Sequence, residues 1–196
     1  METSFQKRIG QIMNKGFNKA ANSFSQMINR PISLAQSSTV IIQSIKEFSY
    51  ASEEQGNLMV LTTGMIGELR GKSLLILSEQ EQTEICHAVS PSQPLTTQFQ
   101  QALLLEIDNI VSASVISQIA NEFNVQVYGD VPALKFIDAG DIHAYLCESL
   151  ENENSDSLIL CNTTFLVGNQ KHIHPQFIWK IGPEVFDLME QTIVKQ

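Results

Sequence analysis

The sequence contains little that would tie it to an oxidising compartment or to a membrane. Its three cysteines, Cys86, Cys147 and Cys161, lie far apart and form no CxxC pair, a pattern typical of reduced thiols and not of a disulfide framework. Residues 1–24 carry basic side chains without an uninterrupted apolar core, so they do not resemble a signal peptide. No run approaches the ~20 apolar residues of a membrane span. We therefore expect a cytoplasmic protein that does not insert into a membrane.

Positive charge is also scarce. The chain has 12 lysines and arginines against 21 aspartates and glutamates, which gives a net charge of -9. Nucleic-acid binding needs basic patches that neutralise phosphates, so nucleic acid is not an expected partner. The acidic surface fits either plain solubility or a partner with a basic rim. Hydrophobic residues make up 43% and charged residues 17% of the 196 residues, which predicts a sizeable core.

Side chains for metal binding or nucleophilic chemistry are equally sparse. His172 and His174 alternate on one predicted strand, but no cysteine or carboxylate lies close to them in sequence, so we interpret them as exposed hairpin histidines. The segment 168–171, GNQK, lacks the pattern of a phosphate-binding loop. No GxSxG motif or Cys/His arrangement supports a covalent mechanism.

Two long amphipathic helices dominate what is present. Apolar residues recur at helical spacing over 3–29, where Pro31 ends the pattern, and again over 97–124, after a proline-bounded linker at 90–94. A similar series of elements follows each helix. In the first half we predict a strand at 38–45, a hairpin at 57–78 and a helix at 79–89. In the second half we predict a strand and turn at 124–134, a helix at 141–152, a hairpin at 156–181 and a helix at 183–194.

The two halves look like copies of one unit. LMVLTTGMIGELRGKSLLIL, from Leu58, aligns with LILCNTTFLVGNQKHIHPQFIW, from Leu158, in its apolar positions and its turn. Neither half matches a short solenoid repeat. We therefore expect a single domain over 1–196, made of pseudo-repeats 1–92 and 95–196.

The outward strips of the two helices carry matching polar pairs. At 100° per residue, Glu106 and Asn109 lie together opposite the apolar side of the second helix. Small residues line the rest of that strip and would let another protein approach closely: Ala102, Ala113, Ser117 and Ala120. The strip of the first helix carries Gln11 and Asn14, then Asn18, Ala21 and Ser25. ExxN alone is a weak signal, because most such pairs are solvated surface; the second copy and a downstream turn proline, Pro132, strengthen it.

These residues resemble the active-site signature of the CheC/CheX/FliY chemotaxis phosphatases, in which an ExxN pair is followed at a distance by a proline: here Glu106, Asn109 and Pro132. The segment QIMNKGFNKAANSFSQM resembles the first copy in CheC, with matches at Asn14, Gly16, Asn18, Ala20, Ala21, Ser25 and Gln26. MIGELRGKSLLIL resembles the family's GxxxG hairpin. The resemblance covers nearly the whole chain and is closest to a CheC-like duplicated chain. It implies an α+β fold: a pseudo-symmetric duplicated domain whose continuous antiparallel sheet carries the two motif helices side by side on one face.

The resemblance also implies a function, the hydrolysis of the phosphoaspartate of a CheY-like response regulator in chemotaxis or two-component signalling. Asn109 would enter the regulator's site and orient a water through its amide. Glu106 would contact the regulator's lysine by a charge-assisted bond. Pro132 would rigidify the neighbouring turn, or it is simply a strand-edge turn residue. Any Mg²⁺ would be carried by the regulator, and we expect no cofactor in this chain.

The departures from the family pattern separate the two halves. In the first half, Gln11 replaces the glutamate and Ser37 stands where the proline would be, so we predict a degenerate site at Gln11 and Asn14 and an intact one in the second half. Ala102 stands where the family often has Asp or Ser. The alternative is a non-catalytic binding module of the same fold that docks on a response regulator, a CheD-like deamidase or the flagellar switch. A small-molecule-binding domain is a third reading, with no pocket-specific residues behind it.

Overall fold

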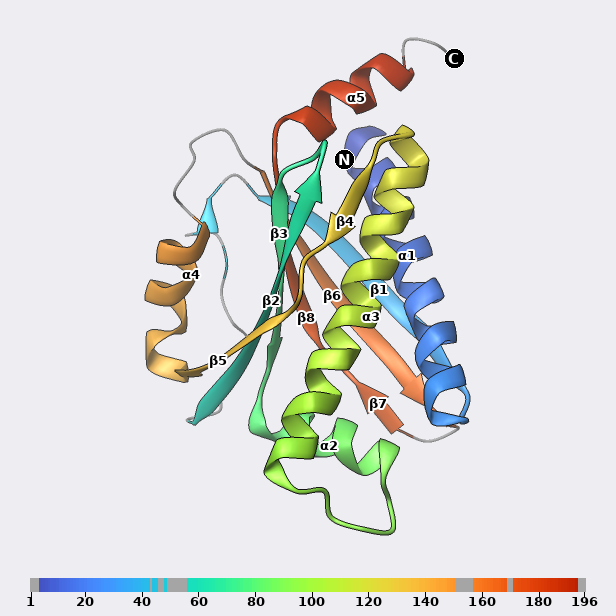
Figure 1. The fold of residues 1–196 in the computed structure, drawn as a ribbon. Coiled ribbons are helices and arrows are strands. Elements are labelled where there is room, and N and C mark those ends of the chain that lie inside the picture. Colours follow the sequence, from blue (N-terminus) through green and yellow to red (C-terminus); the bar gives the residue numbers. More distant parts are fainter. Residues whose placement is uncertain are drawn as a thin grey trace.

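The computed structural model describes residues 4–42, 44–45, 48, 56–150, 157–168 and 171–193. Its helices are α1 (Ser4–Ile28), α2 (Glu79–Val89), α3 (Thr97–Phe123), α4 (Ile142–Leu150) and α5 (Glu184–Ile193), with a 3-10 turn at Ala139–Asp141. Its strands are β1 (Ile32–Ile42), β2 (Asn57–Gly67), β3 (Gly71–Leu77), β4 (Val127–Gly129), β5 (Ala133–Asp138), β6 (Ser157–Val167), β7 (Lys171–Ile173) and β8 (Gln176–Ile181) (Figure 1). The predicted helices and hairpins are confirmed. The strand expected at 38–45 begins earlier, at Ile32, and the second hairpin contains the extra short strand β7.

The strands form one antiparallel sheet in which the two halves exchange partners. The order is β1-β6-β8-β3-β2-β4, while β5 pairs with β2 and β7 with β6. The strand that follows each long helix pairs with the other half: β1 with β6, and β4 and β5 with β2. Strands β3 and β8 pair at the centre. The predicted α+β fold with a continuous antiparallel sheet is confirmed, and the exchange ties together the two pseudo-repeats, whose boundaries stay a prediction.

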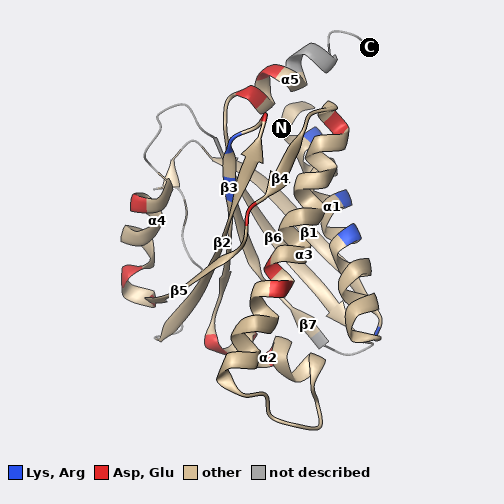
Figure 2. Cartoon of the chain, viewed as in Figure 1, with Lys and Arg blue, Asp and Glu red and all other residues tan. Residues whose placement is uncertain are grey.

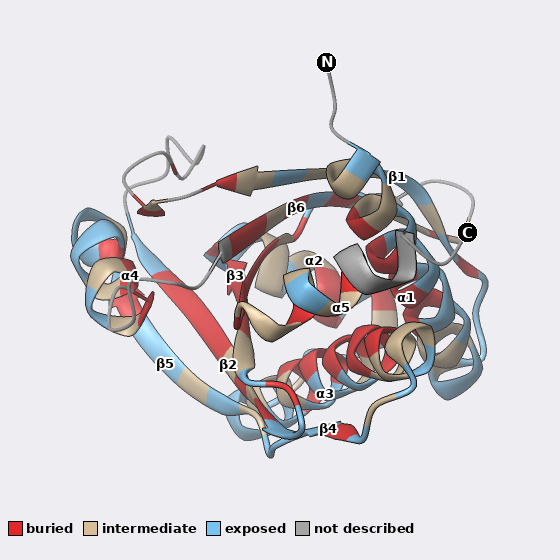
Figure 3. Ribbon diagram, turned by 90° about the horizontal axis from the view of Figure 1, so that it is seen from above, coloured by how far each residue is buried: buried red, intermediate tan, exposed pale blue. Residues whose placement is uncertain are grey.

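The sheet separates two layers of core. On one face, α1 and α3 pack side by side, and their buried residues join those of α2, α5 and the sheet in the larger cluster (Figure 3). On the other face, α4 covers a smaller cluster that includes Leu74, Ile142 and Leu146. One residue departs from the predicted helix faces: Ala21, predicted on the polar strip of the first helix, is buried.

Local signals set the ends of α3 and its contact with α1. Thr96 caps the start of α3 by accepting a hydrogen bond from the backbone N–H of Phe99, and Asn124 ends it in the left-handed conformation, with φ 54°. Gly16 allows α1 to cross α3 closely, because a Cβ built there would lie 2.8 Å from the Cα of Val115. By length and composition α3 could cross a membrane, but 56% of its most apolar window is buried in the fold, as expected for a core helix.

Candidate functional site

Glu106 and Asn109 lie together on the exposed strip of α3. Both side chains are exposed, and the Asn109 amide nitrogen lies 3.5 Å from a Glu106 carboxylate oxygen, at the limit of a hydrogen bond. In the described part of the chain, no group donates to the amide oxygen of Asn109. Ala102 and Ala113 are exposed beside the pair, as predicted. The carboxylate and the amide can therefore reach a partner without first giving up a strong bond within the protein.

Pro132 lies in the break between β4 and β5, where the chain passes along α3. The backbone N–H of Asp130 donates to the carbonyl of Gly64 at 2.8 Å, which holds this break against β2. Gly129, just before it, lies so close to α3 that a Cβ there would be 3.4 Å from the Cδ1 of Ile116. Pro132 itself is half-buried. The structure thus places Pro132 on a segment fixed to both the sheet and α3, and its predicted role stays a prediction.

The strip of α1 has the same frame but different surroundings. Gln11 and Asn14 are exposed, and the Asn14 amide oxygen already accepts a hydrogen bond from Asn18 at 2.7 Å. Lys7 and Lys15, one helical turn to either side of Gln11, are exposed and form no ion pair with any residue that the structure describes. Helix α1 contains no acidic residue and α3 no basic one (Figure 2). The first pair therefore lies in a basic field and the second in an acidic one.

A buried polar cluster lies on the opposite side of α3 from the exposed pair. Asp108 has no exposed surface, and its carboxylate accepts a hydrogen bond from the hydroxyl of Thr63, on β2, at 2.7 Å. It also bonds to the hydroxyl of Ser112, which lies 2.9 Å from the hydroxyl of Ser73, on β3. The second carboxylate oxygen, Oδ1, has no partner among the described residues. Four buried polar side chains thus join α3 to two strands.

Burial changes the acidity of this carboxyl group. Desolvation raises the pKa of Asp108 from 3.8 to about 6, against the opposing effect of the hydrogen bonds from Thr63 and Ser112. This cluster is absent from the site predicted from sequence, although the sequence contains a signal for it. Asp108 falls inside the apolar arc of the helix, next to Leu104 and Val111 on the wheel, whereas Glu106 and Asn109 fall outside it. Asp108 is the ionisable residue on the buried face of α3.

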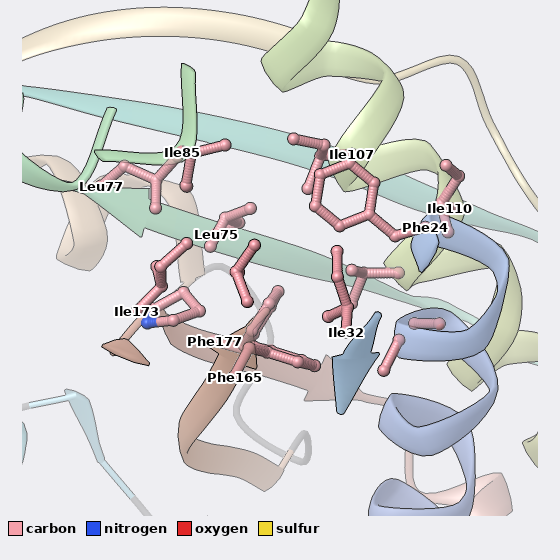
Figure 4. Close-up of a pocket in the computed structure, with 15 residues that line it drawn as sticks. Phe24, Ile32, Leu75, Leu77, Ile85, Ile107, Ile110, Phe165, Ile173 and Phe177 are labelled. Carbon is pink, nitrogen blue, oxygen red and sulfur yellow. The ribbon is translucent and has the colours of Figure 1, made fainter. Parts of the chain in front are cut away.

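The hollow within the apolar core offers little chemistry. A cavity of about 40 Å³ between α1, α3 and the sheet is lined by apolar side chains such as Phe24, Ile107, Phe165 and Phe177 (Figure 4). Its walls present no polar group that would orient a ligand, so it does not support the small-molecule reading. Over the residues that the structure describes, no group of three or more His, Cys, Asp or Glu could hold a metal ion. His172 and His174 are exposed, as expected.

Comparison with known proteins identifies solved structures of similar fold. No family model matches the sequence, and no curated protein matches it. Among solved structures, FliY of Thermotoga maritima is similar with a TM-score of 0.70, at 14% identity over 99% of this chain and 98% of that chain. CheX of Desulfovibrio desulfuricans has a TM-score of 0.54, at 12% identity over 87% of this chain and 99% of that chain. The FliG–FliM complex of H. pylori matches with a TM-score of 0.60, at 11% identity over 93% of this chain and 97% of that chain.

Identities this low establish the fold and leave the activity to be argued from the residues. The architecture extends over nearly the full length of both chains in the FliY comparison. The chain therefore has the fold shared by FliY, the chemotaxis protein CheX and FliM, as its resemblance to the CheC/CheX/FliY proteins led us to expect.

Proposed function

We propose that the protein is a cytoplasmic phosphatase that hydrolyses the phosphoaspartate of a CheY-like response regulator through the α3 strip. The observation that carries the proposal is the exposed Glu106–Asn109 pair, flanked by small side chains, on a helix of a fold that chemotaxis proteins share. A phosphoaspartate is an acyl phosphate and is already reactive. Positioning a water in line with the phosphorus can therefore supply most of the acceleration.

The two side chains suit separate roles in that reaction. The free amide oxygen of Asn109 can accept a hydrogen bond from the attacking water, while its N–H can donate to the phosphoryl group. Glu106 is an exposed carboxylate one turn away and can form a charge-assisted bond with a lysine of the partner. The chain supplies no metal ligand in this scheme, and a Mg²⁺ ion would come with the regulator.

The surroundings of the first pair support a single working site. A regulator lysine that pairs with Glu106 would instead meet Lys7 and Lys15 around Gln11, and like charges at such distances are unfavourable. The bond from Asn18 also occupies the amide oxygen of Asn14 that a water would need. Charge and hydrogen bonding thus both disfavour catalysis at α1.

Decay of a phosphorylated regulator from the same cell tests this function. We expect wild type to accelerate the decay, Asn109→Ala to lose about 100-fold in kcat/KM, and the matched variant Asn14→Ala to remain within about twofold of wild type. Regulator binding, measured separately, should survive Asn109→Ala because the small strip and Glu106 are intact. An inactive wild type would sink the phosphatase proposal. Equal losses in the two variants would sink the single-site claim.

The second candidate is an adaptor without activity, and the similarity to FliM favours it. That structure is a complex of FliM with FliG, so the fold serves there as a binding partner for another protein. In this reading the same α3 strip, or another face, docks on a regulator, a CheD-like deamidase or the flagellar switch. Tight binding of a regulator with no change in its decay would select the adaptor.

A further inference from the structure

Helix α3 buries a carboxylate in a place where the fold does not require one. The two helices occupy equivalent positions on the sheet, so the residue before each asparagine can be compared. In α1 it is Met13, which is fully buried in the apolar core, and in α3 it is Asp108. One turn further, α1 buries Phe17 against Phe177, with ring centroids 5.1 Å apart, where α3 has Ser112. Apolar packing therefore suffices for the architecture.

Burial of Asp108 costs free energy that an apolar side chain at the same place would not cost. A fully buried carboxyl group loses its hydration, and one oxygen of Asp108 has no partner among the described residues. Its hydrogen-bond partners among the described residues are both hydroxyl groups: Thr63 from β2, and Ser112, which is bonded in turn to Ser73 of β3. Among the described residues, no basic side chain lowers the pKa of this carboxyl group. A residue this unfavourable for stability calls for a role in function.

The cluster is connected to both parts of the exposed site. Asp108 directly precedes Asn109, so any shift of its backbone moves the amide. Its partner Thr63 lies against Gly129, whose Cβ would be 3.3 Å from the Thr63 Cγ2, and Gly129 leads into the break that contains Pro132. The side chain of Thr63 thus contacts both sides: its hydroxyl bonds to the helix that presents Asn109, and its methyl group lies against the strand that leads into the break.

We propose that Asp108 is a positioning residue for Asn109: its bonds to Thr63 and Ser112 fix this turn of α3 against β2, so that the exposed amide is held in the orientation that the reaction needs. The inference rests on the phosphatase function proposed above. Asp108 does not touch the regulator and acts only through Asn109 and the neighbouring strand break.

The hydrogen-bond chain has two arrangements, which gives this role a measurable signature. The ionised carboxylate accepts from both Thr63 and Ser112. A protonated carboxyl group can donate one hydrogen bond, and donation to Ser112 reverses the direction of the Ser112–Ser73 bond, in which either hydroxyl can be the donor. The pKa of about 6 puts the change in the range where activity can be measured. Two other titratable groups belong to the neighbouring segments: Glu106, on the exposed side of α3, and Asp130, exposed beside Gly64. The buried residues of α1, which packs against α3, are apolar.

The matched threonines of the two halves supply the test. Thr63 and Thr163 are both buried, on the first strand of the hairpin in each half (β2 and β6), but Thr163 donates to the carbonyl of Pro175 and not to a carboxylate. Regulator dephosphorylation is followed between about pH 5 and pH 8 for wild type, Asp108→Asn, Thr63→Val and Thr163→Val. The side-chain amide resonance of Asn109 is followed by NMR over the same range in each protein.

We expect the wild-type rate to rise about tenfold from the acid end to the neutral end, with an apparent pKa near that of Asp108. Asp108→Asn should be about tenfold slower at neutral pH and lose this dependence, Thr63→Val should be several-fold slower, and Thr163→Val should follow wild type. The Asn109 resonance should titrate with the same midpoint in wild type and not in Asp108→Asn. An Asp108→Asn protein with the wild-type profile and the wild-type Asn109 titration overturns the proposal.

The failure of the phosphatase function is distinguishable from the failure of this inference. A wild-type protein that does not accelerate decay at any pH removes the enzyme. The NMR titration then decides alone: a midpoint near pH 6 that disappears in Asp108→Asn establishes that Asp108 positions Asn109, and a resonance that does not respond to pH rules it out.

Discussion

Helices α1 and α3 each turn a polar pair to the surface, but the two pairs lie in opposite electrostatic surroundings. Around Gln11 the α1 strip carries Lys7 and Lys15, whereas the α3 strip carries a carboxylate, Glu106, and small neighbours. The amide oxygen of Asn14 accepts a hydrogen bond from Asn18, whereas among the described residues the side chain of Asn109 has one hydrogen-bond partner, Glu106, at 3.5 Å. The two helices thus present polar pairs at the same spacing in surroundings of opposite charge.

The strands beside the two helices differ at the equivalent place. In the first half β1 runs through Ser37 with only a shift of register between Leu34 and Gln36. In the second half the strand breaks into β4 and β5 around Pro132, which has no backbone N–H to donate to a ladder. A continuous strand next to α1 and a broken one next to α3 therefore accompany the change in charge.

Among the changes that test the contrast between α1 and α3, removing the charge of Glu106 should have the largest effect on regulator dephosphorylation. Glu106→Gln gives α3 the residue that α1 has at Gln11, and the charge-assisted bond to the partner lysine is lost. We expect kcat/KM for regulator dephosphorylation to fall by about 10- to 100-fold, mainly through KM, with a weaker dependence on salt. Stopped-flow decay at two ionic strengths measures both. If Gln at this position leaves KM unchanged, Glu106 does not orient the partner and the contrast in charge is incidental.

The buried carboxyl group of Asp108, which has no counterpart in α1, should make the free energy of unfolding depend on pH. The pKa of Asp108 is raised from 3.8 to about 6 in the folded protein, so the folded state holds its proton more tightly than the unfolded state. Stability from this group is full at low pH and is lost as the pH rises through about 4 to 6. The free energy of unfolding of Asp108→Asn, taken relative to that of wild type, should therefore increase by on the order of 2–3 kcal/mol from acid to neutral pH. Urea unfolding at the two pH values gives the difference; a constant offset between the proteins would contradict the burial of an ionised group.

Much of the architecture followed from sequence periodicity, and the buried cluster shows where such reasoning ends. A helical wheel separates Glu106 and Asn109 from the apolar side of α3 because that separation is local. It does not reveal that Asp108 meets Thr63, which is 45 residues away, because the contact depends on how β2 lies under the helix. The exchange of strands between the halves and the placement of α4 on the far face are likewise products of long-range pairing, which no local pattern encodes.

The close crossing of the two helices should respond to a single methyl group. A Cβ on Gly16 would lie 2.8 Å from the Val115 Cα, and backbone cannot move aside cheaply. Gly16→Ala should therefore destabilise the protein by about 1–3 kcal/mol, although alanine is intrinsically favoured over glycine in a helix by ~1 kcal/mol. Gly10→Ala on the same helix is the matched control, because its nearest neighbour would be the Thr39 Cβ at 3.8 Å, and it should be neutral or stabilising. Thermal unfolding of the two variants should move in opposite directions.

The smallest expected effect is a partial transfer of function to α1. In an Asn109→Ala background, Gln11→Glu alone should restore nothing, because Lys7 and Lys15 lie within reach of the new carboxylate at i±4 and repel a partner lysine. Adding Lys7→Ala, Lys15→Ala and Asn18→Ala removes that field and frees the Asn14 amide oxygen. We expect decay of the regulator to rise a few-fold above the Asn109→Ala background, about 1 kcal/mol in the barrier. A rate that stays at background would show that the surface residues do not account for the difference between the halves. The strand break at Pro132 and the buried carboxylate of Asp108, neither of which α1 possesses, would then be the features that make α3 the working helix.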